Sequence, residues 1–371
     1  MDAVHLGQLL NHFSAITLLL VGDFFLDRYL DLDRRLGETS LETGLEAYQV
    51  VDVRPSPGAA GTVANNLRAL DVQVTALGVI GDDGEGYELK RALIARGVDI
   101  DPLIVHPDLF TPTYTKPMMR EEDGQRHELN RLDIKNRSPL PDSLQVQLIE
   151  RLRALAPAFD GIVVSDQVVE TNCGVVSDRV RTALAELGQR RPDLIIAVDS
   201  RERIGLFRHA ILKPNAREAL RAVAGQASGR LERQEVQAAG VALFQQTGRP
   251  VSVTIGAEGS MVFTREGVQH VPGVLVSGPI DIVGAGDSTM AGIVASLGAG
   301  AGPGEAALVG NLVASITIQQ IGTTGTASRQ QVLERFREST QSGRAFHRSG
   351  GEPPSSRPHA EAQGEQAAPR A

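Results

Sequence analysis

Two acidic residues and two glycines lie close together late in the chain, in the segment 281–288 with the sequence DIVGAGDS. The small apolar residues that follow, over 290–297, predict a helix whose first turn begins near Gly286. The first turn of a helix offers unpaired N–H groups and the positive end of the helix dipole, and glycines in front of it let an anion approach closely. This arrangement suits phosphate. A carboxylate beside phosphate is repelled, so Asp287 is expected to have a chemical role, and the fitting one is to take a proton from a hydroxyl that attacks phosphorus.

Further acidic side chains end segments that predict buried strands. They are Asp23, Asp166 and Asp199. In an open α/β sheet, ligands bind outside the carboxyl ends of the strands. Asp23 is therefore placed to accept hydrogen bonds from the hydroxyls of a ligand.

Short apolar segments alternate with segments of helical spacing along the chain. The predicted strands cover 16–21, 74–80, 161–165, 194–198, 210–212 and 251–255. The predicted helices cover 64–70, 85–96, 144–155, 175–187 and 236–246. This alternation predicts an α/β fold in which helices cover both faces of a mostly parallel central sheet.

Two segments break this alternation. Tyr29–Val53 and Thr113–Asp133 are polar, rich in β-forming residues and without a helical period. We expect them to form a small sheet that projects from the main domain. Such a lid would exclude water from a reaction that water can intercept.

The composition limits the possible functions. The chain has 371 residues, 42% of them apolar, a net charge of −8 and a single cysteine. The sequence has no long run of basic residues, which argues against a nucleic-acid binder. A single cysteine provides neither a disulfide framework nor a cysteine metal site. The run 16–21 has neither the flanks of a signal peptide nor the length of a membrane span. We expect a cytoplasmic protein with one folded domain over 1–340 and a disordered tail over 341–371.

The segment 281–288 resembles the C-terminal signature D-T-x-G-A-G-D of the ribokinase-like (PfkB-type) carbohydrate kinase family, except that Ile282 stands where Thr is usual. The resemblance implies that Asp287 is the catalytic base and that backbone amides of the signature form the anion hole. Those amides belong to Gly284, Ala285 and Gly286. It also implies the three-layer α/β/α ribokinase-like fold with a β-sheet lid. A glycine turn before a core helix is the alternative interpretation of this segment.

The segment 22–29, GDFFLDRY, resembles the opening of the D-glycero-β-D-manno-heptose 7-phosphate kinase branch of the family. The resemblance implies that Asp23 and Asp27 contact the sugar, with Asp27 at the point where the chain enters the lid. The alternative for Asp27 is an ordinary surface acid.

The segment 57–67 is similar to the family's N-terminal signature, although Ala59 replaces its second glycine. The resemblance implies that Gly58 lets the backbone approach the sugar. It also implies that Asn65 hydrogen-bonds the sugar, or else bridges the turn structurally.

The lid segment carries Lys116 and Arg131 in the same order as heptose 7-phosphate kinases. A phosphorylated sugar needs cationic partners, so either side chain is a candidate for its phosphate. A solvated lid face is the alternative for both.

The segment 213–218, KPNARE, resembles the family's Asn-x-x-Glu region. The resemblance implies that Lys213 and Asn215 serve the nucleotide and that Glu218 acts through water on a Mg²⁺ between the nucleotide phosphates. Capping of the helix alone is the alternative for Asn215 and Glu218. The segment 254–260 resembles the T-x-G-x-x-G strip along the nucleotide, where glycines that only shape a hairpin are the alternative. Its glycines are Gly256 and Gly259. The segment 199–201, DSR, resembles the family's Asp-Pro-Lys, with Ser200 and Arg201 as substitutions.

These resemblances imply an ATP-dependent kinase for a sugar or sugar phosphate, with heptose 7-phosphate as the favoured acceptor. Ribose, fructose, fructose 6-phosphate or a nucleoside remains open as acceptor, and so does a non-catalytic sugar-binding descendant. Mg²⁺ and ATP are implied, K⁺ is a further candidate, and a homodimer through the lid is expected. A dinucleotide oxidoreductase and a Walker-type NTPase are disfavoured because neither glycine signature is present.

Overall fold

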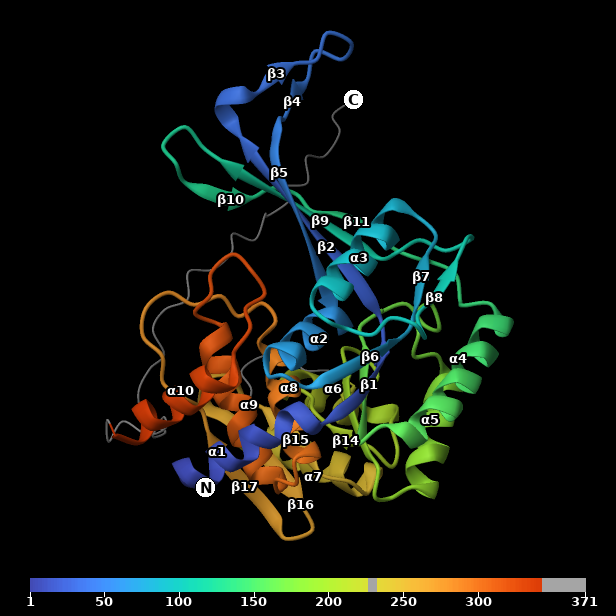
Figure 1. Cartoon of the computed structure of the whole chain (residues 1–371), viewed down its shortest axis with the longest axis vertical. Coiled ribbons are helices and arrows are strands. Elements are labelled where there is room, and N and C mark those ends of the chain that lie inside the picture. The colour runs from blue at the N-terminus through green and yellow to red at the C-terminus, as the bar shows by residue number, and fades with distance from the viewer. Residues whose placement is uncertain (226–231, 342–371) are drawn as a thin grey trace, which may run out of the picture.

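The computed structural model describes residues 1–225 and 232–341 (Figure 1). The expected tail lies outside these residues from position 342 onward. None of the helices within the described ranges combines the length and apolar character that a membrane crossing requires.

The central sheet has eight strands in the order β17-β16-β15-β14-β13-β12-β1-β6. It is parallel from β6 to β15, and β16 and β17 add an antiparallel edge. The strands are β1 (Thr17–Gly22), β6 (Gln73–Leu77), β12 (Gly161–Asp166), β13 (Ile195–Ser200), β14 (Ile211–Leu212), β15 (Val251–Thr254), β16 (Gly259–Thr264) and β17 (Gly267–Pro272). The mostly parallel sheet predicted from the sequence is confirmed.

One predicted strand is divided. The segment 74–80 forms β6 and then β7 (Val79–Gly81), which pairs with β8 (Ile104–His106) in a separate two-stranded sheet. The break falls at Gly78, where a Cβ atom would lie 2.7 Å from the carbonyl oxygen of Gly22 and 2.8 Å from the Phe24 ring. The close approach of the chain at the start of the lid therefore sets the break.

Alternate residues of β1 point to opposite helix layers. Leu18 and Leu20 belong to one buried apolar cluster, and Leu19 and Val21 to another. The first cluster includes residues of α1 (Ala3–His12), α2 (Ala60–Ala69), α3 (Gly84–Ala95), α8 (Ala285–Gly298), α9 (Pro303–Thr317) and α10 (Arg329–Gln341). The second includes residues of α4 (Asp142–Leu155), α5 (Asp178–Arg190), α6 (Ala216–Ala224) and α7 (Arg233–Thr247). The fold is thus a three-layer α/β/α arrangement.

The lid is a second sheet in the order β10-β9-β2-β5, with β11 paired to β9. Its strands are β2 (Phe24–Asp33), β5 (Val50–Ala59), β9 (Thr113–Arg120), β10 (Arg126–Glu128) and β11 (Leu132–Ile134), and a small β3 (Glu38–Thr39) and β4 (Glu46–Ala47) pair extends it. Figure 1 shows it projecting from one end of the main domain. The predicted lid is confirmed, but β2 begins directly after Asp23 and β5 runs directly into α2. The lid strands therefore start at the ligand edge of the central sheet.

Candidate active site

The N-terminus of α8 carries the glycine-rich segment. Gly284 caps the helix in a left-handed conformation (φ 78°), which glycine adopts without strain. The amide of Ala285 donates to the carbonyl oxygen of Ile282 (3.1 Å), so it closes the turn. The amides of Gly286 and Asp287 have no acceptor in the described part of the chain. The anion hole predicted from the amides of Gly284, Ala285 and Gly286 stays a prediction. In the described residues the Gly284 amide also has no acceptor, and Asp287 adds a free N–H that was not predicted.

A buried lysine lies beside these amides. A Cβ atom added to Gly286 would lie 3.5 Å from Lys213 Nζ, and Lys213 Nζ is 3.1 Å from Asp199 Oδ2. Burial works to lower the pKa of Lys213, but the charges of Asp199, Glu218 and Asp287 outweigh it, and the pKa is raised. The ammonium group therefore stays charged next to the free amides. A cation and two N–H groups converge where an anion would bind.

Asp287 has the acidity expected of a general base. Burial raises its pKa to about 7, and the charge of Asp199 adds to the rise, while Lys213 and Arg201 oppose it. A base works best when its pKa lies near the working pH. The charge of Asp27, at the base of the lid, also works to raise the pKa of Asp287.

Asn215 and Glu218 form a capping box at the start of α6. Asn215 Oδ1 accepts from the Glu218 amide (2.9 Å), and Glu218 Oε2 accepts from the Asn215 amide (2.7 Å). Burial and Asp199 raise the pKa of Glu218, which is half-buried. The capping role left open by the sequence is present, and the second carboxylate oxygen remains available. Within residues 1–225 and 232–341, no three His, Cys, Asp or Glu side chains are grouped to hold a metal ion by themselves.

Gly256 and Gly259 shape the connection between β15 and β16. Their φ angles are 63° and 96°, and a Cβ atom on Gly259 would lie 2.3 Å from the carbonyl oxygen of Val271. The hairpin itself therefore requires these glycines. Contact with a nucleotide stays a prediction for both.

At the base of the lid, Lys116 forms an ion pair with Asp27. Lys116 Nζ lies 3.2 Å from Asp27 Oδ2 and donates to the Tyr29 hydroxyl (3.3 Å). Burial works to lower the pKa of Lys116, but Asp27 and Tyr29 outweigh it, so the pKa is raised. Asp27 is 7% exposed, so it is not an ordinary surface acid. A Cβ atom on Gly58 would lie 2.9 Å from the Asp27 carboxyl carbon, so Gly58 makes room for this pair.

Arg131 lies at the side of the lid, directly before β11. It donates to both oxygens of Asp133 (2.6 and 2.8 Å) and stacks 4.1 Å from the centre of the Tyr114 ring. The pair with Asp133 occupies the guanidinium group, and the Arg131 side chain is half-exposed. Both observations favour the alternative in which Arg131 lies on a solvated face of the lid.

The N-terminus of α2 lies next to that of α8, because a Cβ atom on Gly284 would contact Thr62 at 3.4 Å. Asn65 on α2 is 5% exposed, and its Oδ1 has no hydrogen-bond donor in the described part of the chain. A buried, unpaired amide oxygen is costly unless a ligand satisfies it. The contact of Asn65 with the sugar stays a prediction.

Asp23 has partners that the sequence did not indicate. Its carboxylate accepts from the backbone amides of Gln167 (2.8 Å), Val168 (3.0 Å) and Val175 (2.7 Å), and it is 3% exposed. Burial raises its pKa despite these hydrogen bonds. The observed partners thus belong to the loop after β12, and the sugar contact expected of Asp23 stays a prediction.

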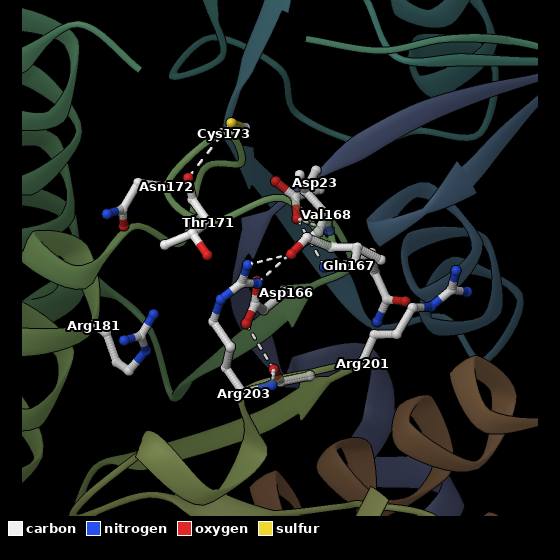
Figure 2. Close-up of polar contacts among 12 residues, drawn as sticks. Asp23, Asp166, Gln167, Val168, Thr171, Asn172, Cys173, Arg181, Arg201 and Arg203 are labelled. Carbon is white, nitrogen blue, oxygen red and sulfur yellow. Dashed lines mark hydrogen bonds and ion pairs between the residues drawn. The ribbon is translucent and has the colours of Figure 1, made fainter. Parts of the chain in front are cut away.

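The sequence analysis also missed Arg203, which contacts the same loop (Figure 2). No spacing rule identifies it. The only sequence signal nearby is the strand end at Asp199.

The comparisons with known proteins agree with this geometry. The signature of the pfkB family carbohydrate kinases matches residues 36–330. The chain belongs to this family. It is 30% identical over 338 residues to the "Bifunctional protein HldE" of Trichlorobacter lovleyi, covering 87% of this chain and 64% of that protein, so it spans less than two thirds of that relative.

Solved structures share the fold. The ribokinase of Arabidopsis thaliana, complexed with ribose and ATP, superposes with a TM-score of 0.62 at 18% identity and covers 87% of this chain and 99% of its own. The phosphofructokinase-2 of Escherichia coli in complex with fructose-6-phosphate has a TM-score of 0.64 at 17% identity, with coverages of 87% and 98%. The ribokinase-like fold is therefore shown.

Proposed function

We propose that this carbohydrate kinase transfers the γ-phosphoryl group of ATP to a hydroxyl of a sugar phosphate, with D-glycero-β-D-manno-heptose 7-phosphate as its acceptor. The observation that carries the proposal is the meeting of Asp287, two free amides and Lys213 at the start of α8. The heptose assignment is supported by the similarity to HldE proteins and by the segment 22–29. We also propose that the enzyme works in the cytoplasm.

In this mechanism Asp287 accepts the proton of the attacking hydroxyl. The amides of Gly286 and Asp287 and the ammonium group of Lys213 bind the oxygens of the transferring phosphoryl group. Asp199 keeps Lys213 charged and in place through their 3.1 Å contact. The reaction is then mainly a matter of position and charge, as is usual for phosphoryl transfer.

The residues present fit a Mg²⁺ bound through the nucleotide. Mg²⁺ prefers oxygen ligands and keeps several of its waters, and the second oxygen of Glu218 lies at the same end of the sheet as Lys213 and Asp287. When bound, the ion would neutralise charge on the donor phosphates. Glu218 would orient it through water, without direct coordination.

An ADP-release screen tests the proposal. The panel contains D-glycero-β-D-manno-heptose 7-phosphate, fructose 6-phosphate, ribose, fructose and a nucleoside, with Asp287→Asn as the background control. We expect the fastest release with the heptose phosphate. Faster ADP release with another acceptor would support the kinase activity but assign it a different acceptor. Binding of sugar and ATP without turnover would instead support a non-catalytic descendant.

A further inference from the structure

The loop over 167–175 follows β12 and is held from two sides. On one side, the Asp23 carboxylate accepts three of its backbone amides. On the other side, Arg203 Nη1 donates to the carbonyl oxygen of Val168 (2.8 Å) and Nη2 to that of Val169 (2.5 Å). The Asp23 carboxylate therefore accepts from N–H groups of the loop, and the Arg203 guanidinium donates to its carbonyl oxygens. Buried backbone groups need hydrogen-bond partners, and bonds to charged side chains are stronger than those between neutral groups.

Arg203 is itself fixed by two buried side chains. Its guanidinium lies 3.5 Å from Asp166 Oδ1, and its backbone amide donates to Ser200 Oγ (3.0 Å). The Ser200 hydroxyl in turn donates to Asp166 Oδ2 (2.6 Å). Figure 2 shows Arg203 reaching from the end of β13 past Asp166 to the loop. Burial and the neighbouring Asp23 raise the pKa of Asp166 to about 7.

Ser200 is one of the positions where this chain departs from its family. The segment 199–201 is Asp-Ser-Arg where the resemblance predicts Asp-Pro-Lys. A proline there could neither donate to Asp166 nor accept from the Arg203 amide. Ser200, which departs from the family pattern, therefore belongs with Asp166 and Arg203 to the group of residues that hold the loop.

The loop forms one wall of a hollow beneath the lid. The hollow is small, with a cavity volume of about 20 Å³, and the lid base forms its facing wall with Phe25 and Tyr114, whose rings meet edge to face at 5.2 Å. Gln167 and Lys135 also line it. The amide of Gln167 suits the hydroxyls of a sugar phosphate, whereas Lys135 Nζ lies 3.6 Å from Glu170 Oε1, so a phosphate would compete with Glu170 for this cation. Phe25 and Asp27 lie two residues apart on β2, so their side chains point to the same face of the lid.

We propose that Asp166, Ser200 and Arg203 are positioning residues that fix the segment 167–170 against the lid base and so set which acceptor the enzyme phosphorylates. They act through the loop backbone. If Arg203 is lost, two carbonyl groups lose their charged donor, and the loop no longer has one favoured shape against the lid. The acceptor part of this inference rests on the proposed function, whereas the loop-holding part does not.

Hydrogen exchange measured by mass spectrometry tests the loop-holding part. The variants are Arg203→Met, the conservative Arg203→Lys, and Ser200→Ala. The control is Arg249→Met, because Arg249 also donates to two loop carbonyls, those of Pro192 and Leu194, but at the opposite edge of the sheet. We expect exchange of residues 166–175 to be at least about tenfold faster in Arg203→Met and less affected in Arg203→Lys. Unchanged loop exchange in Arg203→Met, or an equal increase in every peptide, would overturn the proposal.

Steady-state kinetics test the acceptor part, with D-glycero-β-D-manno-heptose 7-phosphate and fructose 6-phosphate as probes. We expect Arg203→Met to raise the KM for the preferred acceptor at least about tenfold. The ratio of the kcat/KM values for the two acceptors should fall, while the KM for ATP stays within about twofold of the parent value. Arg249→Met should match the parent. Faster loop exchange with unchanged acceptor KM would refute the specificity role. A parent without activity on either probe would instead refute the proposed acceptor class and leave the exchange result to decide the loop-holding role.

Discussion

At the scale of single residues, the acidity of Asp287 makes a prediction about pH. Burial and Asp199 raise its pKa from 3.8 to about 7, so the carboxylate forms only near neutrality. We expect kcat/KM to fall as the pH is lowered, with an apparent pKa of about 7. We also expect Asp287→Asn to lower kcat by about two to four orders of magnitude. A pH–rate profile measures both. A profile that is flat from about pH 5 to about pH 8 would remove Asp287 as the base.

The same shift predicts a cost in stability. Because the folded-state pKa lies above the unfolded one, the native chain holds a proton that the unfolded chain releases between these two values. Stability contributed by this group therefore falls as the pH rises through that window, and the loss persists above it. We expect Asp287→Asn to melt at a higher temperature than the parent near about pH 8, with the difference shrinking toward about pH 4. A lower Tm at both pH values would contradict this sign.

Arg201 is the cation near Asp287 that has no acidic partner in the described part of the chain. Its charge works to lower the pKa of Asp287. Arg201→Met should therefore move the acid limb of the pH–rate profile to higher pH, and should lower kcat at least about tenfold if the guanidinium also binds the transferring phosphoryl group. The control is Arg217→Met, which removes an exposed arginine on α6. An unmoved acid limb would show that the two charges do not interact.

Glu218 makes a prediction about the metal. Glu218→Gln keeps a side chain that can complete the capping box but removes the negative charge. We expect the Mg²⁺ concentration for half-maximal rate to rise, because an anion that orients the hydrated ion is lost. Titration of the rate with Mg²⁺ at saturating ATP measures this. An unchanged midpoint would leave Glu218 only its capping role.

The sequence predicted part of the site because strand ends and helix starts obey general rules. Lys213, Asp199 and Asp287 meet because parallel strands end at one edge of the sheet and α8 begins above it. The partners of individual side chains could not be predicted in the same way. The Lys116–Asp27 pair depends on the register between β2 and β9, and the contacts of Asp23 depend on the path of the loop after β12, which strand and helix periodicity does not specify.

At the scale of elements, Ala59 occupies a conformation that suits glycine. It joins β5 to α2 with φ 54° and ψ −119°, and it is the residue that replaces the second glycine of the family signature. Ala59→Gly should therefore raise the free energy of unfolding by about 1 kcal/mol, because the strain of the Cβ atom is relieved. Ala64→Gly, inside α2, should lower it by a similar amount or more. Urea denaturation measures both, and a destabilised Ala59→Gly would show that the turn is not strained.

The limits of sequence prediction appear at the same scale. The alternation of strands and helices and the two lid segments follow from periodicity, and the structure confirms them. The helix α1 was not predicted, and the break at Gly78 was missed, since both depend on distant parts of the chain packing against them. The lid strands also extend beyond the predicted segments, because their inner ends are buried against the main domain.

At the scale of the whole molecule, the outer part of the lid leaves apolar side chains in solvent. They are Leu41, Leu45, Tyr48, Val50, Val51 and Val53. Two acidic residues of the outer part of β2 are already paired within the same sheet, Asp31 with Arg54 and Asp33 with Arg120. A second copy of this sheet could therefore approach without strong repulsion, and edge strands favour such pairing. We propose that two chains associate through their lids as a homodimer.

Sedimentation velocity tests this association. The parent should sediment as a dimer at micromolar concentration, and Val50→Asp should shift it to the monomer, because an unpaired charge buried in the interface costs several kcal/mol. The matched control is Val268→Asp, which places the same charge at an exposed valine on β17, at the far edge of the central sheet (Figure 1). A parent that sediments as a monomer rules out the dimer. A Val50→Asp variant that remains dimeric would show that the interface lies elsewhere than on the lid. The lid would then cover only the site of its own chain.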